Sequence, residues 1–213
     1  AAVAAGFEQG VGPEQVARSP LADVAWAYMR SRVLHAAAEL GIADRLAAGP
    51  LSADELAAGT GTHAPSLRRL LRALVAMGIL AQDGAGGGPP DRYALTELGD
   101  DLRRDAPATV SHVVRFLCSA GPWDAWGDVL TSLRTGETAF DRLRGTTAFE
   151  HLARHPAEAE VFNAAMSQLT KGTGAGIVAG WDASRFGTIV DVGGGDGTFL
   201  GQVLAAHPGA RGV

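Results

Sequence analysis

The sequence has very little cysteine and very little lysine. Cys118 is the only cysteine among 213 residues, so no disulfide can form within the chain, which fits a reducing compartment. Lys171 is the only lysine, and acidic residues outnumber basic ones by 23 to 18, for a formal net charge of −5. This balance disfavours a protein that binds a polyanion such as nucleic acid over its whole surface.

The chain also lacks long hydrophobic runs. No stretch approaches the roughly 20 apolar residues that a membrane-spanning helix requires. Ala1 to Gly10 contain neither a basic start nor a long apolar segment, so they do not resemble a signal peptide. We therefore expect a soluble, cytoplasmic protein that binds no membrane. Its 46% hydrophobic residues are enough for a sizeable core in one large or two small domains.

The first half of the sequence predicts, in order, a loose tail, a long helix, a helix-turn-helix and a hairpin. Ser52 and Glu55 have the spacing of a capping box, which predicts that a helix begins there. A helix-turn-helix followed by a hairpin is typical of a winged helix. The segments are 1–19 for the tail, 20–107 for the winged-helix domain, 64–78 for the second helix of the motif and 79–96 for the hairpin.

Three arginines on that second helix raise the question of DNA binding. Arg68, Arg69 and Arg72 lie on one side of it, where a DNA-reading helix presents side chains to phosphates and bases. However, Asp54 lies on the first helix, and the hairpin loop contains no basic residue, although phosphate contacts supply most of the affinity for DNA. These charges favour a scaffold whose arginines are solvated or pair with acids across a dimer.

The middle of the chain, residues 108–180, again predicts helices, which we expect to form a linker and part of a pocket. Turn-rich sequences at 119–122 and 136–145 predict two interruptions. The glycines between Gly172 and Gly176 would weaken any helix that contains them.

Two histidines in this region have the spacing of a metal pair. His151 and His155 are one helical turn apart. Without a third ligand nearby in the sequence, we interpret them as part of a solvated helix face, and we predict no metal site.

The most informative motif lies near the end of the sequence. The run from Thr188 to Val192 predicts a strand, the glycines at 193 to 197 predict a tight turn, and the apolar pattern from Phe199 predicts a helix. Such a strand–turn–helix unit opens many nucleotide- or nucleoside-binding α/β domains. A P-loop is excluded, because no Gly-Lys-Ser/Thr follows the turn.

An acidic residue within the turn narrows the choice of cofactor. A dinucleotide fingerprint needs its third glycine where this sequence has Thr198. Asp196 lies in the turn itself, and its carboxylate would repel a pyrophosphate at the helix N-terminus. The turn therefore favours a phosphate-free cofactor such as S-adenosylmethionine, whose amino-acid end Asp191 could help to hold. The alternative is a glycine-rich turn that binds nothing.

Four stretches, taken in order, resemble one family. The motif Val190-Asp-Val-Gly-Gly-Gly-Asp-Gly197 resembles the first cofactor motif of small-molecule O-methyltransferases, the bacterial antibiotic-tailoring and plant phenolic enzymes. The stretch 33–44 resembles the opening helix of their dimerisation domain, and 67–80 resembles its winged-helix segment. Phe162-Asn-Ala-Ala-Met166 resembles the segment between substrate and cofactor. The resemblance covers residues 21–213.

The resemblance implies a mainly α winged-helix dimerisation domain, followed in residues 181–213 by the start of a Rossmann-like α/β methyltransferase domain. It implies S-adenosylmethionine as cofactor, S-adenosylhomocysteine as product, and an aromatic or polyketide-like methyl acceptor. It also implies a homodimer, formed through N-terminal helices and a winged helix that binds no nucleic acid. The implied cofactor-binding residues are Met166, Thr170, Asp191, Gly193, Gly194, Gly195 and Asp196, and the implied substrate-binding residues are Phe116, Trp123, Trp126, Phe162 and Met166.

The resemblance further implies a catalytic group that this sequence does not contain. The family's general base for SN2 methyl transfer is a histidine after the fourth strand, which would follow Val213, so we assign no catalytic residue here. A lone strand–helix unit cannot form a stable sheet, and we expect these residues to be the leading part of a longer polypeptide. Two other interpretations stay open, namely a winged-helix DNA-binding regulator and a non-catalytic partner subunit with the methyltransferase fold.

Overall fold

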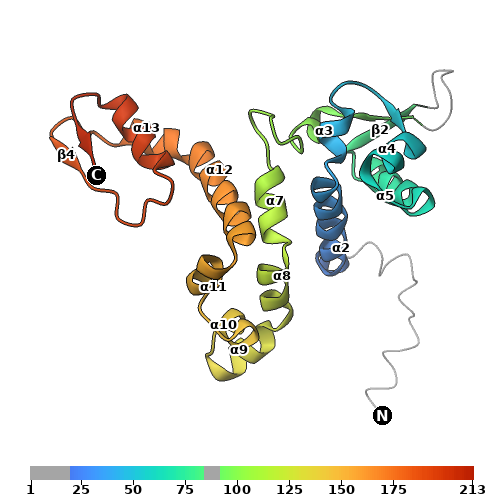
Figure 1. Ribbon diagram of the computed structural model, residues 1–213, viewed down its shortest axis with the longest axis horizontal. Helices are drawn as coiled ribbons and strands as arrows, with labels where there is room; N and C mark the ends of the chain where they lie inside the picture. Colours follow the sequence, from blue (N-terminus) through green and yellow to red (C-terminus); the bar gives the residue numbers. More distant parts are fainter. Residues whose placement is uncertain (1–19, 84–91) are drawn as a thin grey trace, which may run out of the picture.

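The computed structural model describes residues 20–83 and 92–213. These residues form mainly helices, with a three-stranded antiparallel sheet near the start and a two-stranded parallel sheet at the end. Figure 1 shows three parts, in which a set of helices separates the N-terminal helices and sheet from the terminal strand–helix unit. The predicted loose tail (1–19) and the predicted loop of the hairpin lie outside the described residues.

The N-terminal part consists of helices packed on a small sheet of strand order β1-β3-β2. Gly41 adopts a left-handed φ of 61°, which ends the first helix and turns the chain into the next one. Both hairpin strands pair antiparallel, with Leu80 opposite Leu95. The elements are α2 (Pro20–Glu39), α3 (Ile42–Leu46), β1 (Leu51–Ser52), α4 (Ala53–Thr60), α5 (Ala64–Ala76), β2 (Leu80–Asp83) and β3 (Arg92–Leu95).

The predicted capping box at the start of α4 is confirmed. The Ser52 hydroxyl accepts a hydrogen bond from the backbone N–H of Glu55 at 3.1 Å, and the Glu55 carboxylate accepts one from the backbone N–H of Ser52 at 2.7 Å. Two donors that a helix start leaves without intrahelical partners are thereby satisfied.

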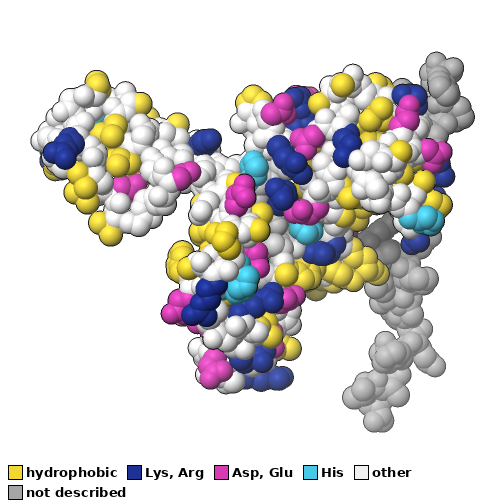
Figure 2. Space-filling view, viewed as in Figure 1, with side chains coloured by type: hydrophobic (Ala, Val, Ile, Leu, Met, Phe, Trp, Pro, Cys, Tyr) yellow, Lys and Arg dark blue, Asp and Glu magenta, His cyan; other side chains and the backbone are white. Residues whose placement is uncertain are grey.

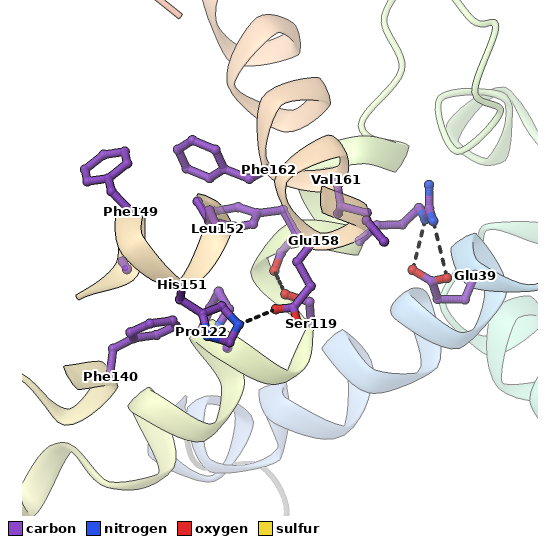
Figure 3. Close-up of a pocket in the computed structure, with 15 residues that line it drawn as sticks. Glu39, Ser119, Pro122, Phe140, Phe149, His151, Leu152, Glu158, Val161 and Phe162 are labelled. Atoms are coloured by element: carbon purple, nitrogen blue, oxygen red, sulfur yellow. Dashed lines mark hydrogen bonds and ion pairs between the residues drawn. The ribbon is translucent and has the colours of Figure 1, made fainter. Parts of the chain in front are cut away.

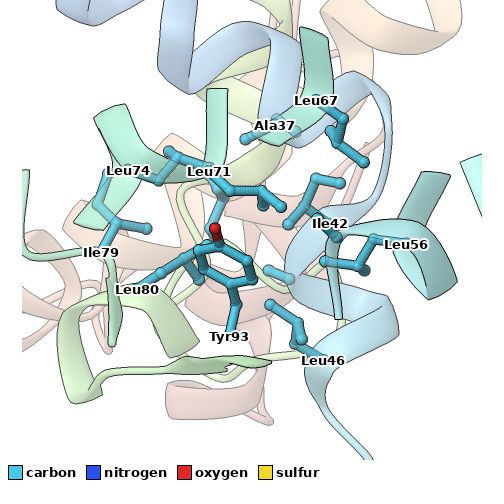
Figure 4. Packing of buried hydrophobic residues seen from close by; sticks show 14 of the residues in the cluster. Ala37, Ile42, Leu46, Leu56, Leu67, Leu71, Leu74, Ile79, Leu80 and Tyr93 are labelled. Atoms are coloured by element: carbon cyan, nitrogen blue, oxygen red, sulfur yellow. The ribbon is translucent and has the colours of Figure 1, made fainter. Parts of the chain in front are cut away.

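The core of this part lies between α5, the hairpin and the first helices. Figure 4 shows Tyr93 of β3 close to Leu80, with Leu71 and Leu74 of α5 above them. Leu56, Leu71 and Tyr93 are completely buried. Burying an apolar side chain of this size contributes about 1.5–3 kcal/mol, so α5 is held by its apolar stripe and not by helix propensity alone.

The middle of the chain folds into short helices and one long one. The interruption predicted at 136–145 is present at both ends of this range, where Gly136 and Gly145 have positive φ angles and end α9 and α10, but the short helix α10 lies between the two breaks. At 119–122 the break is limited to Ser119, and α8 contains Pro122 in its first turn. The helices are α6 (Glu97–Asp100), α7 (Ser111–Leu117), α8 (Ala120–Gly127), α9 (Val129–Thr135), α10 (Ala139–Arg144), α11 (Ala148–Arg154) and α12 (Pro156–Gly180).

Helix α12 runs without a break through the glycines at 172 to 176, where we predicted a weakened helix. The reason is tertiary. Gly174 is buried, and a Cβ atom at this position would clash with the side chain of Gln202 on α13. The glycine allows the two helices to approach closely, and their packing compensates for the low helix propensity.

The terminal unit contains β4 (Thr188–Ile189), α13 (Thr198–Ala206) and β5 (Arg211–Gly212). Strand β4 is shorter than predicted, but it has a partner, because β5 returns parallel to it. The apolar side chains that follow β4, Val190 and Val192, are exposed to solvent, and Val192 is 92% exposed. In the described part of the chain, no helix combines the length and the apolar character needed to cross a bilayer.

Candidate functional site

Backbone geometry explains why glycine occupies several positions between β4 and α13. Gly193 and Gly195 adopt left-handed φ angles of 78° and 61°, which residues with a Cβ rarely tolerate. Gly194 has an ordinary φ, but a Cβ at this position would clash with the Asp191 carboxylate. The backbone of this glycine loop (193–197) therefore turns tightly beside the Asp191 side chain, and Asp196 is the only residue of the loop that has a side chain.

Asp196 ties the glycine loop to the long helix α12. The Ser167 hydroxyl on α12 donates a short hydrogen bond to Oδ2 of Asp196, and the backbone N–H of Thr198 donates one to Oδ1 at 3.0 Å. These hydrogen bonds lower the pKa of Asp196 to about 2. The bond from Ser167 has the largest effect, and those from Thr198 follow. The carboxylate is therefore ionised at neutral pH.

Asp191 has an unsatisfied oxygen at the same loop. Its Oδ2 is buried and accepts no hydrogen bond from any residue in the described ranges. A buried carboxylate oxygen without a donor is costly, and a cationic or N–H donor on a ligand would relieve this. Two carboxylates at one turn disfavour a phosphate group and suit the ammonium of an amino-acid moiety.

A cavity of about 640 Å³ lies between the glycine loop and α12, within the roughly 300–1,000 Å³ of small-molecule sites. Every cofactor-binding residue that the sequence predicts lies in its wall, although the loop and the helix are far apart in the chain. These residues are Met166, Thr170, Asp191, Gly193, Gly194, Gly195 and Asp196, and Phe162 lines the same cavity.

A second, smaller cavity of about 290 Å³ adjoins the first and is mostly apolar. Phe149, Leu152 and Phe162 line both cavities, so the two spaces share a wall. Phe116 of α7 and Phe162 of α12 meet edge to face, with ring centroids 5.2 Å apart. Figure 3 shows Phe140, Phe149 and Phe162 around this space, which suits a flat aromatic ligand.

The two tryptophans predicted as pocket walls lie elsewhere in this structure. Trp126 is 75% exposed, and it lines neither of these two cavities. Trp123 stacks against the guanidinium of Arg32 on α2, whose Cζ lies 4.8 Å from the centroid of the tryptophan ring. Trp123 also lines neither cavity. Their substrate-binding roles remain predictions.

The prediction of a solvated face for the histidine pair was wrong at His151. This side chain is only 8% exposed, and it lines the apolar cavity. Glu158 on α12 supplies the neighbouring acid that was not recognised in the sequence, since its carboxylate lies 3.2 Å from Nε2 of His151. The two residues are seven apart, and the break between α11 and α12 at Pro156 hides that spacing from a helical pattern.

An ion pair closes another side of the apolar cavity. Arg115 of α7 donates to the Glu39 carboxylate of α2 at 2.9 Å, and both residues line the space. The pair joins the N-terminal part to the helices of the cavity. Because the ion pair is partly exposed, it contributes little to stability. We attribute to it the role of orienting α2 relative to α7.

Comparison with known proteins places this geometry in a family. A model described as the O-methyltransferase dimerisation domain matches residues 22–105, and one described as the O-methyltransferase domain matches residues 123–213. The chain belongs to the S-adenosylmethionine-dependent O-methyltransferase family. The two matches together include all of the described residues except 20–21 and 106–122.

Individual relatives agree with this assignment. The chain is similar to the phenazine O-methyltransferase PhzM of Lysobacter antibioticus, with 37% identity over 87% of this chain and 53% of the relative. It is similar to the mitomycin biosynthesis 6-O-methyltransferase of Streptomyces lavendulae, with 34% identity over 96% of this chain and 57% of the relative. The chain thus spans about half the length of these curated relatives.

Among solved structures, the chain is similar to the O-methyltransferase NcsB1 from neocarzinostatin biosynthesis. The TM-score is 0.71 with 37% identity, over 86% of this chain and 55% of that one. That crystal structure contains S-adenosylmethionine and 2-hydroxy-5-methyl naphthoic acid.

Proposed function

We propose that this protein acts as an S-adenosylmethionine-dependent O-methyltransferase on an aromatic natural product. The observation that carries the proposal is the pair of adjoining cavities. One is lined by the glycine loop and two carboxylates, and the other is apolar and aromatic. A methyl donor and a flat acceptor need such neighbouring sites, because the acceptor oxygen has to approach the methyl group in line.

The roles of the residues follow from their chemistry. We assign Asp191 and Asp196 to the cationic amino-acid end of the cofactor, and the glycines to close backbone contact with it. The cofactor supplies an electrophilic methyl group on a sulfonium. Phe162 lies in the wall that the two cavities share, and Met166 lines the cavity at the glycine loop; both would orient the acceptor ring and exclude water. We assign the base that takes the acceptor proton to none of the described residues.

We also propose that α4, α5 and the β2–β3 hairpin form a winged helix that serves dimerisation and does not bind DNA. Arg68 on α5 pairs with Asp54 on α4 at 3.3 Å, which reduces the positive charge offered by that helix. Exposed apolar side chains gather on α2, and Figure 2 shows a hydrophobic patch over this region. A second copy of the chain is the proposed partner of this patch.

Titration calorimetry with S-adenosylhomocysteine tests the cofactor assignment. We expect binding to the wild-type chain and a loss of at least about tenfold in affinity for Gly194→Ala, because the new methyl group displaces the Asp191 carboxylate. Gly201→Ala on α13 is the matched control, since a Cβ there meets nothing within 4 Å, and its affinity should equal that of the wild type. Equal affinities for all three chains would contradict the proposed site.

A further inference from the structure

One imidazole in the apolar cavity is held in a single orientation from three sides. Nε2 of His151 lies 3.2 Å from the Glu158 carboxylate. One face of the ring stacks on His155, with centroids 3.9 Å apart and planes 17° from parallel. Phe140 stands nearly perpendicular to it at 5.5 Å. Figure 3 shows His151 pointing toward Glu158 beside Phe140. A polar group that is fixed in this way inside an apolar wall is preorganised for binding.

The carboxylate determines which nitrogen of the ring can accept a hydrogen bond. A carboxylate only accepts, so Nε2 carries the proton in the neutral ring, and Nδ1 carries the lone pair. No residue in the described ranges donates to Nδ1 of His151. Among the polar residues that line the cavity, Glu39 is paired with Arg115 and Glu158 with Nε2 of His151, so Nδ1 of His151 is an acceptor that a ligand with a proton to donate can satisfy.

We propose that the His151–Glu158 pair is the polar anchor of the acceptor cavity and selects aromatic acceptors with a second ring hydroxyl, which donates to Nδ1 of His151. The inference rests on the proposed function, in which this cavity holds the acceptor. A methyl ether in the same position has no proton to donate, so it leaves Nδ1 unsatisfied and adds a methyl group to a cavity of about 290 Å³.

The same three side chains could be mistaken for a metal site. Ligand atoms of His151, His155 and Glu158 all lie within 4.8 Å of one another. However, a metal ion lies in the plane of each imidazole that binds it, and two nearly parallel rings 3.9 Å apart cannot both aim a lone pair at one ion. The Nδ1–H of His155 also donates to the backbone carbonyl of His151 at 2.8 Å, which holds the stack in place.

The experiment compares two probes with the same ring system, naphthalene-2,7-diol, which has two O–H donors, and 2,7-dimethoxynaphthalene, which has none and carries two more methyl groups, by titration calorimetry with and without S-adenosylhomocysteine. The wild-type chain should bind the diol about 3- to 10-fold more tightly than the ether, as expected for one hydrogen bond. His151→Phe keeps the ring volume and should abolish this ratio. Glu158→Gln should reduce it, because a carboxamide, unlike a carboxylate, can also donate to Nε2 and so places the proton on Nδ1 in part of the molecules.

His155→Phe is the matched control, because it keeps an aromatic face against His151 and removes a nitrogen that a metal would need. It should preserve the preference for the diol. An unchanged ratio in both His151→Phe and Glu158→Gln overturns the proposal, as does a wild-type chain without any preference. Zinc binding that His155→Phe removes would assign the cluster to a metal instead. Glu158 is half-exposed, so its variant tests the proposal even if His151→Phe fails to fold.

The measurements distinguish a failure of the proposed methyl transfer from a failure of the proposed His151–Glu158 anchor. A wild-type chain that prefers the diol but binds no S-adenosylhomocysteine contradicts the proposed methyl transfer and leaves the anchor intact. A chain that binds S-adenosylhomocysteine without discriminating between the two probes contradicts the anchor alone.

Discussion

At the scale of single residues, the glycine loop depends on a hydroxyl that lies outside it. Ser167 is 29 positions before Asp196, yet it is the main cause of the low pKa of that carboxyl group. No spacing rule connects the two residues, since α12 and the loop meet only in the folded chain. The sequence identified both Asp191 and Asp196 as candidate ligands, but it could not show that the second is anchored by α12.

Replacing Ser167 by alanine should therefore raise the pKa of Asp196 from about 2 toward the ordinary value. In the wild type, the contribution of this carboxylate to stability is complete above its unfolded pKa of about 3.9 and is lost as the pH falls through about 2. In the variant, this contribution should itself be smaller, because the folded pKa of Asp196 lies closer to the unfolded one. A carbon-13 NMR titration of the carboxyl groups measures the change.

A matched pair provides the control for this titration. Ser184 lowers the pKa of Asp182 in the same manner, by a side-chain hydrogen bond of 2.6 Å, away from the cofactor cavity. Ser184→Ala should shift Asp182 alone. If Asp196 titrates normally in the wild type, the proposed anchoring by Ser167 is wrong.

At the scale of elements, α12 shows how packing overrides a local preference. Its glycines predict a weak helix, and three of them lie in five consecutive positions. Only Gly174 among them lies close to α13, whereas a Cβ atom at Gly172 or Gly176 would meet nothing within 4 Å. The helix is continuous because α7 and α13 pack against it, and it brings Phe162, Met166 and Thr170 to the cavities.

Substitution should separate the two kinds of glycine in α12. Gly176→Ala removes the entropic cost of an exposed helical glycine and should stabilise the chain by about 0.5–1 kcal/mol. Gly174→Ala requires the Gln202 side chain to move away, so its gain should be smaller or negative. Urea denaturation compares the two variants. Equal stabilisation would mean that α12 and α13 do not approach each other as described.

At the scale of the whole molecule, α2 exposes several large apolar side chains to solvent. Leu21 and Val24 are 81% and 72% exposed, although a helix of a soluble domain normally buries its apolar side chains. The match to a dimerisation domain includes this helix from residue 22 onward. The ion pair between Glu39 and Arg115 then links the proposed interface helix to the acceptor cavity.

Light scattering after gel filtration tests the dimer. The wild-type chain should elute as a dimer, and the double variant Leu21→Glu with Val24→Glu should shift to a monomer, because four charges would meet in a symmetric interface. Thr135→Glu, at an exposed position on α9, is the charge control and should stay dimeric. A dimeric double variant would move the interface away from the start of α2.

The sequence by itself determined the features that depend on neighbouring residues: the capping box at Ser52, the apolar stripe of α5, the glycine loop and the helix that follows it. These features arise from local hydrogen bonds, periodicity and backbone freedom. Only the tertiary structure decided that His151 is buried beside Glu158, that Ser167 holds Asp196 and that β5 pairs with β4. Each of these contacts joins different elements, and burial and pairing across elements exist only once the elements have packed.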